Sequence, residues 1–128
     1  MRKINYIEFQ ENIKESAKIC REEPTKWLTK KTTGKGFAAD YMTWTKVWLW
    51  VSKKYDNDFE FKVLEVGEEH VLATLRVLGS ESTLGLKLES FIKRDGKVHK
   101  ETIEQVQMRI FVKLVANITG FGLNLWLK

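Results

Sequence analysis

Apolar residues recur along this chain with two different periods, and the change of period separates predicted helices from predicted strands. Helical spacing first appears between Tyr6 and Glu23, where the residues toward one side are Ile7, Ile13, Ala17 and Cys20. It returns between Thr43 and Tyr55 with an apolar stripe of Trp44, Val47, Trp48 and Val51. A third, mostly apolar stretch begins at Thr102 and ends at Gly120. These patterns predict an N-terminal helix, a Trp-rich helix and a long C-terminal helix.

A period of two residues occupies the region between the second and third helices. The stretches in which apolar and polar residues alternate are Phe59–Val63, Val71–Val77 and Leu84–Leu88, with turns predicted at Gly67 and Gly79. A further hairpin is predicted at Lys93-Arg94-Asp95-Gly96. The order of elements predicts an α+β fold, in which an antiparallel meander of three to four strands packs on the long C-terminal helix.

A stretch rich in Lys, Thr and Gly interrupts this pattern. Residues Lys30 to Lys35 show no clean period and are predicted to form a mobile basic loop. The loop divides the chain into residues 1–36, an N-terminal helical arm with the loop, and residues 37–128, the core domain.

Two bases stand out on the last helix. Arg109 and Lys113 are four residues apart and therefore share one face, with Gln105 before them and Asn117 after them. A like-charge pair at this spacing weakens an isolated helix by roughly 0.2–0.5 kcal/mol, and no acid lies three or four residues from either base. The pattern predicts an anionic partner outside the helix, which points to nucleic acid.

The composition is consistent with a nucleic-acid partner but does not establish one. The chain has a net charge of +5 and a pI of about 9.3, which favours phosphate-rich partners or other anionic surfaces. Its one cysteine, Cys20, excludes an intrachain disulfide and is expected to be buried. The sequence has no apolar core of a signal peptide and no window approaching the ~20 apolar residues that span a bilayer. A cytoplasmic protein without membrane contact is predicted.

Catalytic and cofactor motifs are not found. His70, His99 and Cys20 do not have the spacing of metal ligands. The segment Thr33–Gly36 is not a phosphate-binding loop, because Thr29 and Gly36 stand where Gly and Ser or Thr are required. Gly120 and Gly122 follow a helix rather than a strand, as a helix cap does and a dinucleotide-binding turn does not. The chain is predicted to be no enzyme and to hold no metal or cofactor.

A second group of candidate contacts lies on the Trp-rich helix and the strands. Trp44 and Trp48 are predicted to be core residues, whereas Trp50 lies off the apolar stripe and is a candidate either for base stacking or for a subunit interface. The bases near Trp50 are Lys46, Lys53 and Lys54. Lys62, Arg76 and Lys87 lie on strands and could share one face of the sheet; whether they do depends on the register, which the sequence leaves open.

Two segments together resemble a known family. Tyr41-Met42-Thr43-Trp44 followed by Val47-Trp48, and Met108-Arg109 through Lys113 to Gly120-Phe121-Gly122-Leu123, resemble the Sak-type single-strand annealing proteins of bacteriophages. The resemblance covers roughly residues 37–126. It implies a β-meander on a long helix, as in the eukaryotic Rad-type annealing recombinases.

The resemblance also implies how such a protein works. It implies rings or filaments of subunits that hold single-stranded DNA in a basic groove and anneal complementary strands without ATP, with a phage exonuclease or a host single-strand-binding protein as further partners. By position, Arg109 and Lys113 match the family's helix bases, and Tyr41 and Trp44 match its aromatic entry motif. Asn117 and Asn124 depart from it, since the family is usually apolar or aromatic there.

Three functions are therefore weighed. Annealing of single-stranded DNA is preferred; a module that binds single-stranded DNA or RNA and protects it without annealing, and a structural or regulatory oligomer, are the alternatives. Under the preferred function, Arg109→Ala with Lys113→Ala is expected to abolish DNA binding and leave folding intact.

Overall fold

The computed structural model describes residues 2–32, 38–92 and 96–125, which form four α-helices, seven strands and a short 3-10 turn. Backbone alone is described for 29–32, 38–41 and 91–92. The elements in chain order are α1 (Tyr6–Glu22), α2 (Pro24–Trp27), β1 (Leu28–Thr32), β2 (Ala38–Met42), α3 (Trp44–Lys54), β3 (Phe59–Val66), β4 (His70–Val77), β5 (Ser80–Lys87), β6 (Ser90–Ile92), β7 (Val98–Lys100), α4 (Ile103–Thr119) and η1 (Leu123–Leu125).

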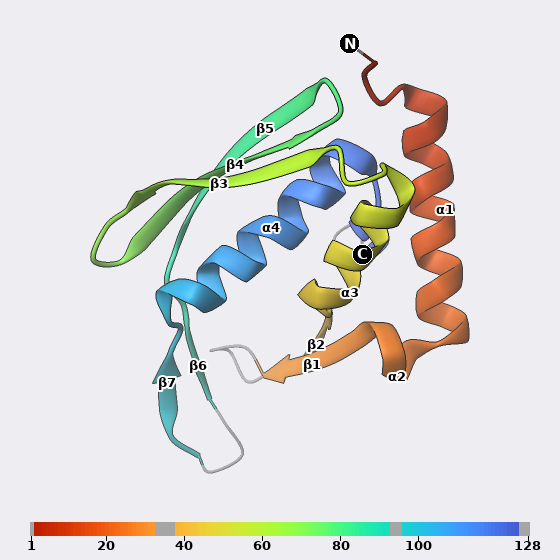
Figure 1. Cartoon of the computed structure of the whole chain (residues 1–128). Coiled ribbons are helices and arrows are strands. Elements are labelled where there is room, and N and C mark those ends of the chain that lie inside the picture. The colour runs from red at the N-terminus through yellow and green to blue at the C-terminus, as the bar shows by residue number, and fades with distance from the viewer. Residues whose placement is uncertain (1, 33–37, 93–95, 126–128) are drawn as a thin grey trace.

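The centre of the fold is a three-stranded antiparallel sheet in the order β3-β4-β5, with α4 lying against its concave side (Figure 1). Alternation of apolar and polar residues on β4 gives this sheet a dry face. The four side chains of β4 that face α4 are fully buried, namely Val71, Ala73, Leu75 and Val77. The predicted α+β class, with a meander packed on a long C-terminal helix, is confirmed.

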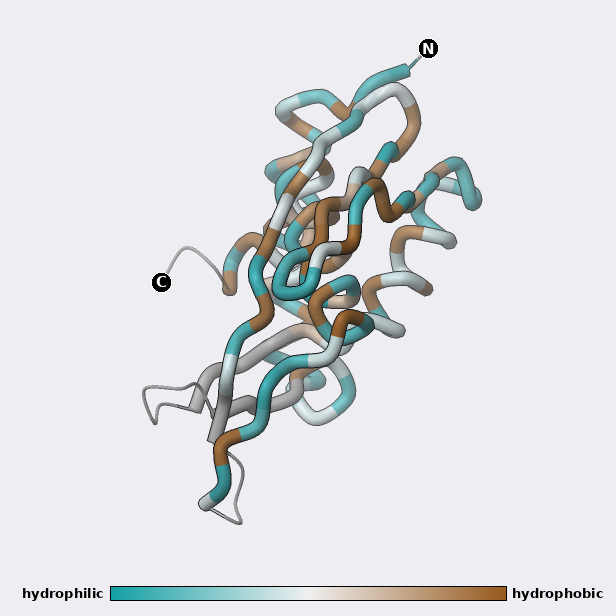
Figure 2. Tube along the Cα trace, turned by 90° about the vertical axis from the view of Figure 1, so that its left-hand side faces the viewer, coloured by the Kyte–Doolittle hydropathy of each residue, from teal (hydrophilic) through white to brown (hydrophobic). Residues whose placement is uncertain are grey.

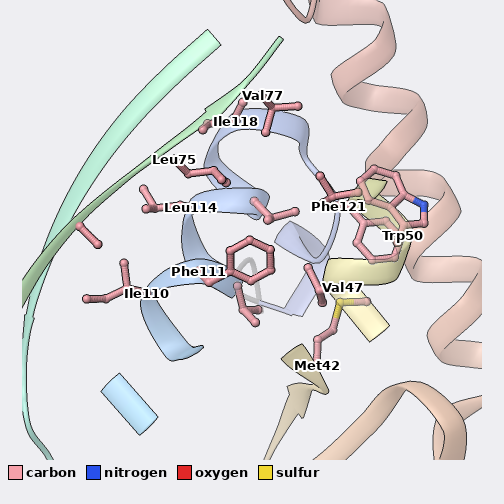
Figure 3. Close-up of a cluster of buried hydrophobic side chains, with 14 of the residues drawn as sticks. Met42, Val47, Trp50, Leu75, Val77, Ile110, Phe111, Leu114, Ile118 and Phe121 are labelled. Carbon is pink, nitrogen blue, oxygen red and sulfur yellow. The ribbon is translucent and has the colours of Figure 1, made fainter. Parts of the chain in front are cut away.

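The bounds of α4 follow from the residues at its two ends. Thr102 caps the helix through a capping box, in which its hydroxyl accepts from the Gln105 N–H and the Gln105 side chain accepts from the Thr102 N–H. At the other end Gly120 adopts a φ of +87°, which a glycine tolerates best, and the helix stops there. The predicted glycine cap is confirmed. Between the caps, α4 is buried against the sheet and, on its other side, against α3 (Figure 3).

On α3, the buried stripe differs from the predicted one. The buried residues are Val47, Trp50 and Val51, whereas Trp48 is 39% exposed and Trp44 is half-buried. The prediction that Trp50 lies at the surface was therefore wrong. The physical reason is a pair of long-range contacts that the pattern of α3 alone does not reveal: Trp50 stacks on Phe121, beyond the end of α4, and donates to Glu15 of α1. Trp48, predicted in the core, is only partly covered, with its ring packed on Phe59 and Phe111.

The N-terminal helix α1 packs against the body rather than forming a detached arm. Asn12 donates to the Tyr55 hydroxyl at 2.7 Å and to the Thr119 carbonyl at 2.9 Å, and Ser16 donates to the Asn124 side chain. The side that faces the body is marked by buried Asn12, Ser16 and Cys20, while Ile7, predicted to face inward, is 71% exposed. The proposed boundary at residue 36 therefore does not separate α1 from the contacts of the core.

Two hairpins extend from the body on the side away from the three-stranded sheet (Figure 1). β1 pairs with β2 and β6 pairs with β7, each antiparallel, and each hairpin leads directly into a long helix, α3 or α4. β1 was not predicted: it takes in Lys30 to Thr32 of the expected mobile loop, whose remaining residues lie outside the described ranges. The expected hairpin near Lys93–Gly96 corresponds to β6 and β7. Its residues 93–95 lie outside the described ranges. Figure 2 shows the two hairpins extending below the rest of the chain.

Candidate nucleic-acid interface

Arg109 lies on α4 beside the end of β5, where the protein itself supplies its anionic partner. Its Nε donates to one carboxylate oxygen of Glu101 at 3.1 Å, and a terminal nitrogen donates to the other at 2.9 Å and to the Lys87 carbonyl at 2.8 Å. The side chains of Arg109 and Glu101 are only 9% and 6% exposed. The anionic partner that was predicted outside the helix is therefore Glu101 of the protein itself, so the charge of Arg109 does not by itself point to nucleic acid.

Glu89 completes this arrangement, which we call the Arg109 clamp (Arg109, Glu101 and Glu89). The Glu89 N–H donates to the Glu101 carboxylate, the Glu101 N–H donates to the Glu89 carbonyl, both at 2.8 Å, and Arg109 reaches the Glu89 carboxylate at 3.5 Å. Glu89 and Glu101 flank the β6–β7 hairpin, so the clamp fixes the base of that hairpin to α4. Sequence spacing missed it because Glu101 lies eight residues before Arg109 and outside the helix.

Lys113 lies one helical turn beyond Arg109 and is half-buried. Burial lowers the pKa of its ammonium group; the nearby positive charge of Arg109 acts in the same direction, and Glu89 opposes both. The two bases thus differ, although the sequence predicted one role for both: Arg109 is bound within the clamp, whereas Lys113 is only partly withdrawn from solvent.

Lys62, Arg76 and Lys87 do share one face of the sheet, which is one of the arrangements that the sequence left open. In the observed pairing Lys62 lies opposite Thr74, Arg76 lies between Glu60 and Glu81, and Lys87 lies opposite His70, all facing away from α4. Acids interrupt them. Arg76 donates to Asp58 and to the Leu78 carbonyl at 2.9 and 2.7 Å, and Lys62 lies 3.0 Å from Glu60. This face has mixed charge rather than a basic groove.

On α3, the predicted contacts divide into buried and exposed ones. Trp50 is stacked on Phe121 with ring centroids 3.9 Å apart and donates to Glu15 at 3.2 Å, so its ring is not free to stack on a base (Figure 3). Lys46 is half-buried, and Lys53 and Lys54 are exposed, the latter 3.7 Å from Glu15. Tyr41 lies on β2 opposite Thr29, and the placement of its side chain is outside what the structure describes.

Positive charge is concentrated in one continuous part of the chain, which we call the basic run (residues 26–54). It contains seven lysines and a single acid, Asp40, and so carries a formal charge of +6, whereas the whole chain carries +5. The lysines are Lys26, Lys30, Lys31, Lys35, Lys46, Lys53 and Lys54. The run comprises the end of α2, the β1–β2 hairpin and α3, so the largest excess of lysine lies in one hairpin and the helix that follows it.

Comparison with known protein families, characterised proteins and solved structures finds no match to this chain. Among the described residues, no three or more His, Cys, Asp or Glu side chains are grouped as a metal site. Within the same ranges no helix has both the length and the apolar character needed to cross a membrane.

Proposed function

We propose that this protein binds single-stranded DNA through its phosphates and anneals complementary strands without ATP. The observation that carries the proposal is the basic run, which by itself accounts for the positive charge of the chain. Lysines that neutralise phosphates release counterions, and this release drives binding of nucleic acid without regard to base sequence. The resemblance to phage annealing proteins is the reason for choosing single-stranded DNA as the partner.

Annealing requires that two polyanions approach each other. Lysines along the β1–β2 hairpin and α3 would lower the repulsion between the strands, while contacts restricted to phosphates leave the bases available for pairing. In this proposal the Arg109 clamp has a positioning role, since it fixes the β6–β7 hairpin, and Lys113 adds positive charge beside it. Trp50 has a packing role.

The first test is a titration of a fluorescently labelled single-stranded oligonucleotide at several salt concentrations. The variant Lys30→Ala/Lys31→Ala/Lys53→Ala removes three charges from the basic run, and Lys3→Ala/Lys14→Ala/Lys18→Ala is the matched control on exposed residues outside it. We expect weaker binding for the first variant only. The slope of log K against log salt should become shallower by roughly 0.7 for each phosphate that the variant no longer neutralises. Equal effects of both variants would refute a localised interface.

A second test separates annealing from protection. Two complementary oligonucleotides, one labelled with a donor and one with an acceptor dye, are mixed with and without the protein, and the rate of pairing is measured. Acceleration that disappears in the basic-run variant supports annealing. Salt-dependent binding without acceleration would identify a protecting protein, and binding that does not depend on salt would favour a structural or regulatory oligomer.

A further inference from the structure

The free edge of β3 carries an apolar surface that the rest of the fold leaves open. β3 is an outer strand of the sheet, and within the described ranges no strand pairs with its other edge. Val63, Leu64 and Val66 of β3 are 39%, 52% and 52% exposed. Apolar residues scattered singly over a surface are ordinary, whereas three within four positions of an edge strand are typical of an interaction site.

The register shows why these side chains are open. Val63 and Val66 lie opposite Ala73 and Val71, so they point to the same side of the sheet as the core. Ala73 and Val71 are fully buried, but their partners on β3 are not. The helices cover β4 but do not extend over the second half of β3. A partner seated along β3 would continue the same apolar layer.

The charges of β3 match a second copy of the same strand. A β-bulge between Val63 and Glu65 adds one residue, so Lys62 and Glu65 point to the same side although three positions separate them. Two antiparallel copies with Lys62 opposite Glu65 form this pair twice about a twofold axis. The same alignment sets Phe61 opposite Val66 on the apolar side, also twice, and sets no two like charges against each other.

We propose that the partner of the β3 edge is a second copy of this chain, joined in that register so that two sheets become one six-stranded sheet. The interface is isologous: the same strand serves both subunits. Backbone hydrogen bonds along the free edge and burial of Val63, Leu64 and Val66 stabilise it, and the two Lys62–Glu65 pairs fix its register. The proposal does not rest on nucleic-acid binding and is tested without nucleic acid.

The experiment is light scattering coupled to gel filtration over a range of micromolar to millimolar concentrations. The wild-type chain is expected to reach twice its mass of 15.0 kDa. Lys62→Glu and Glu65→Lys each turn both cross-strand pairs into like-charge pairs and should raise the dissociation constant roughly tenfold. Mixing these two variants restores opposite charges across the interface, so a heterodimer with near wild-type affinity is expected.

Lys87→Glu, an equal change of charge on the exposed face of β5, is the control and should leave the dimer unchanged. Circular dichroism establishes that each variant is folded. A wild-type chain that stays monomeric throughout would overturn the proposal. So would a dimer that both single variants leave intact, since that dimer forms elsewhere, or a mixture that fails to recover affinity.

Discussion

The contact of α4 with the sheet and the contact of α1 with the body, at the end of α4, pack in different ways. Toward the sheet α4 meets Val71, Ala73, Leu75 and Val77, an apolar and fully buried surface. Where α4 ends, α1 packs with buried Asn12 and Ser16, which form hydrogen bonds to the body. The first contact depends on matching apolar area and tolerates some sliding, whereas the second depends on individual atoms. We therefore expect the hydrogen bonds of α1 to fix one position for that helix. They should contribute less to the free energy of unfolding than the apolar contact between α4 and the sheet.

The largest effect is expected at the Arg109 clamp, the polar cluster that lies on α4 beside the end of β5. Arg109→Ala leaves the Glu101 carboxylate buried without its partner and should lower the free energy of unfolding by about 3–5 kcal/mol. The sequence alone had instead predicted that folding would stay intact. Chemical denaturation measures the loss, and Arg109→Ala combined with Glu101→Gln should recover part of it. A change below about 1 kcal/mol would show that the clamp contributes no more than a surface ion pair.

The next largest effect is expected in the apolar contact between α4 and the sheet. Leu75→Ala removes a fully buried side chain between β4 and α4 and should cost about 2–5 kcal/mol, because a cavity remains that the sheet fills only in part. Leu64→Ala, on the exposed edge of β3, is the matched control at low protein concentration. Similar losses for the two substitutions would mean that burial does not distinguish these positions.

Sequence patterns predicted the contact of α4 with the sheet well and the contact of α1 with the body poorly. Alternation identified β4, and the glycine at residue 120 identified the end of α4, because both signals are local. The buried face of α1 was missed because Asn12 and Ser16 are polar, and their partners Thr119 and Asn124 lie more than a hundred residues away. The partner of Arg109 was missed for a related reason, since Glu101 precedes the helix. Trp50 was misassigned because Phe121, far along the chain, stacks on its ring.

Gly120 tests how closely α1 approaches the body. A Cβ there would lie 2.4 Å from the Phe9 carbonyl oxygen, and φ is +87°. Gly120→Ala should therefore cost more than the roughly 1–3 kcal/mol of backbone strain alone, because α1 must also move. Gly96→Ala is the control, with φ of +77° and no atom within 4 Å of the added carbon. Equal melting temperatures for the two variants would mean that α1 does not hold this close approach in solution.

Asn12 tests the hydrogen bonds of the same contact. Asn12→Ala leaves the Tyr55 hydroxyl and the Thr119 carbonyl buried without this donor and should cost about 1–3 kcal/mol. Lys14→Ala, on the exposed side of α1, should change stability little. Protection of α1 amides in hydrogen exchange should fall in the first variant while that of β4 persists. Equal loss in both elements would indicate that α1 and the sheet unfold as one unit.

The smallest effect concerns the N-terminal end of α1. Burial opposes ionisation of Glu8, but hydrogen bonds from Arg2 and Tyr55 outweigh it and hold the pKa of Glu8 below its usual range. A carboxylate with a lowered pKa stabilises the folded state above its unfolded pKa of about 4.3, and this contribution is lost as pH falls through the folded value. Glu8→Gln should therefore melt at a lower temperature than the wild type at neutral pH, with the difference narrowing in acid. A difference that stays constant with pH would assign the effect to packing of the side chain rather than to its charge.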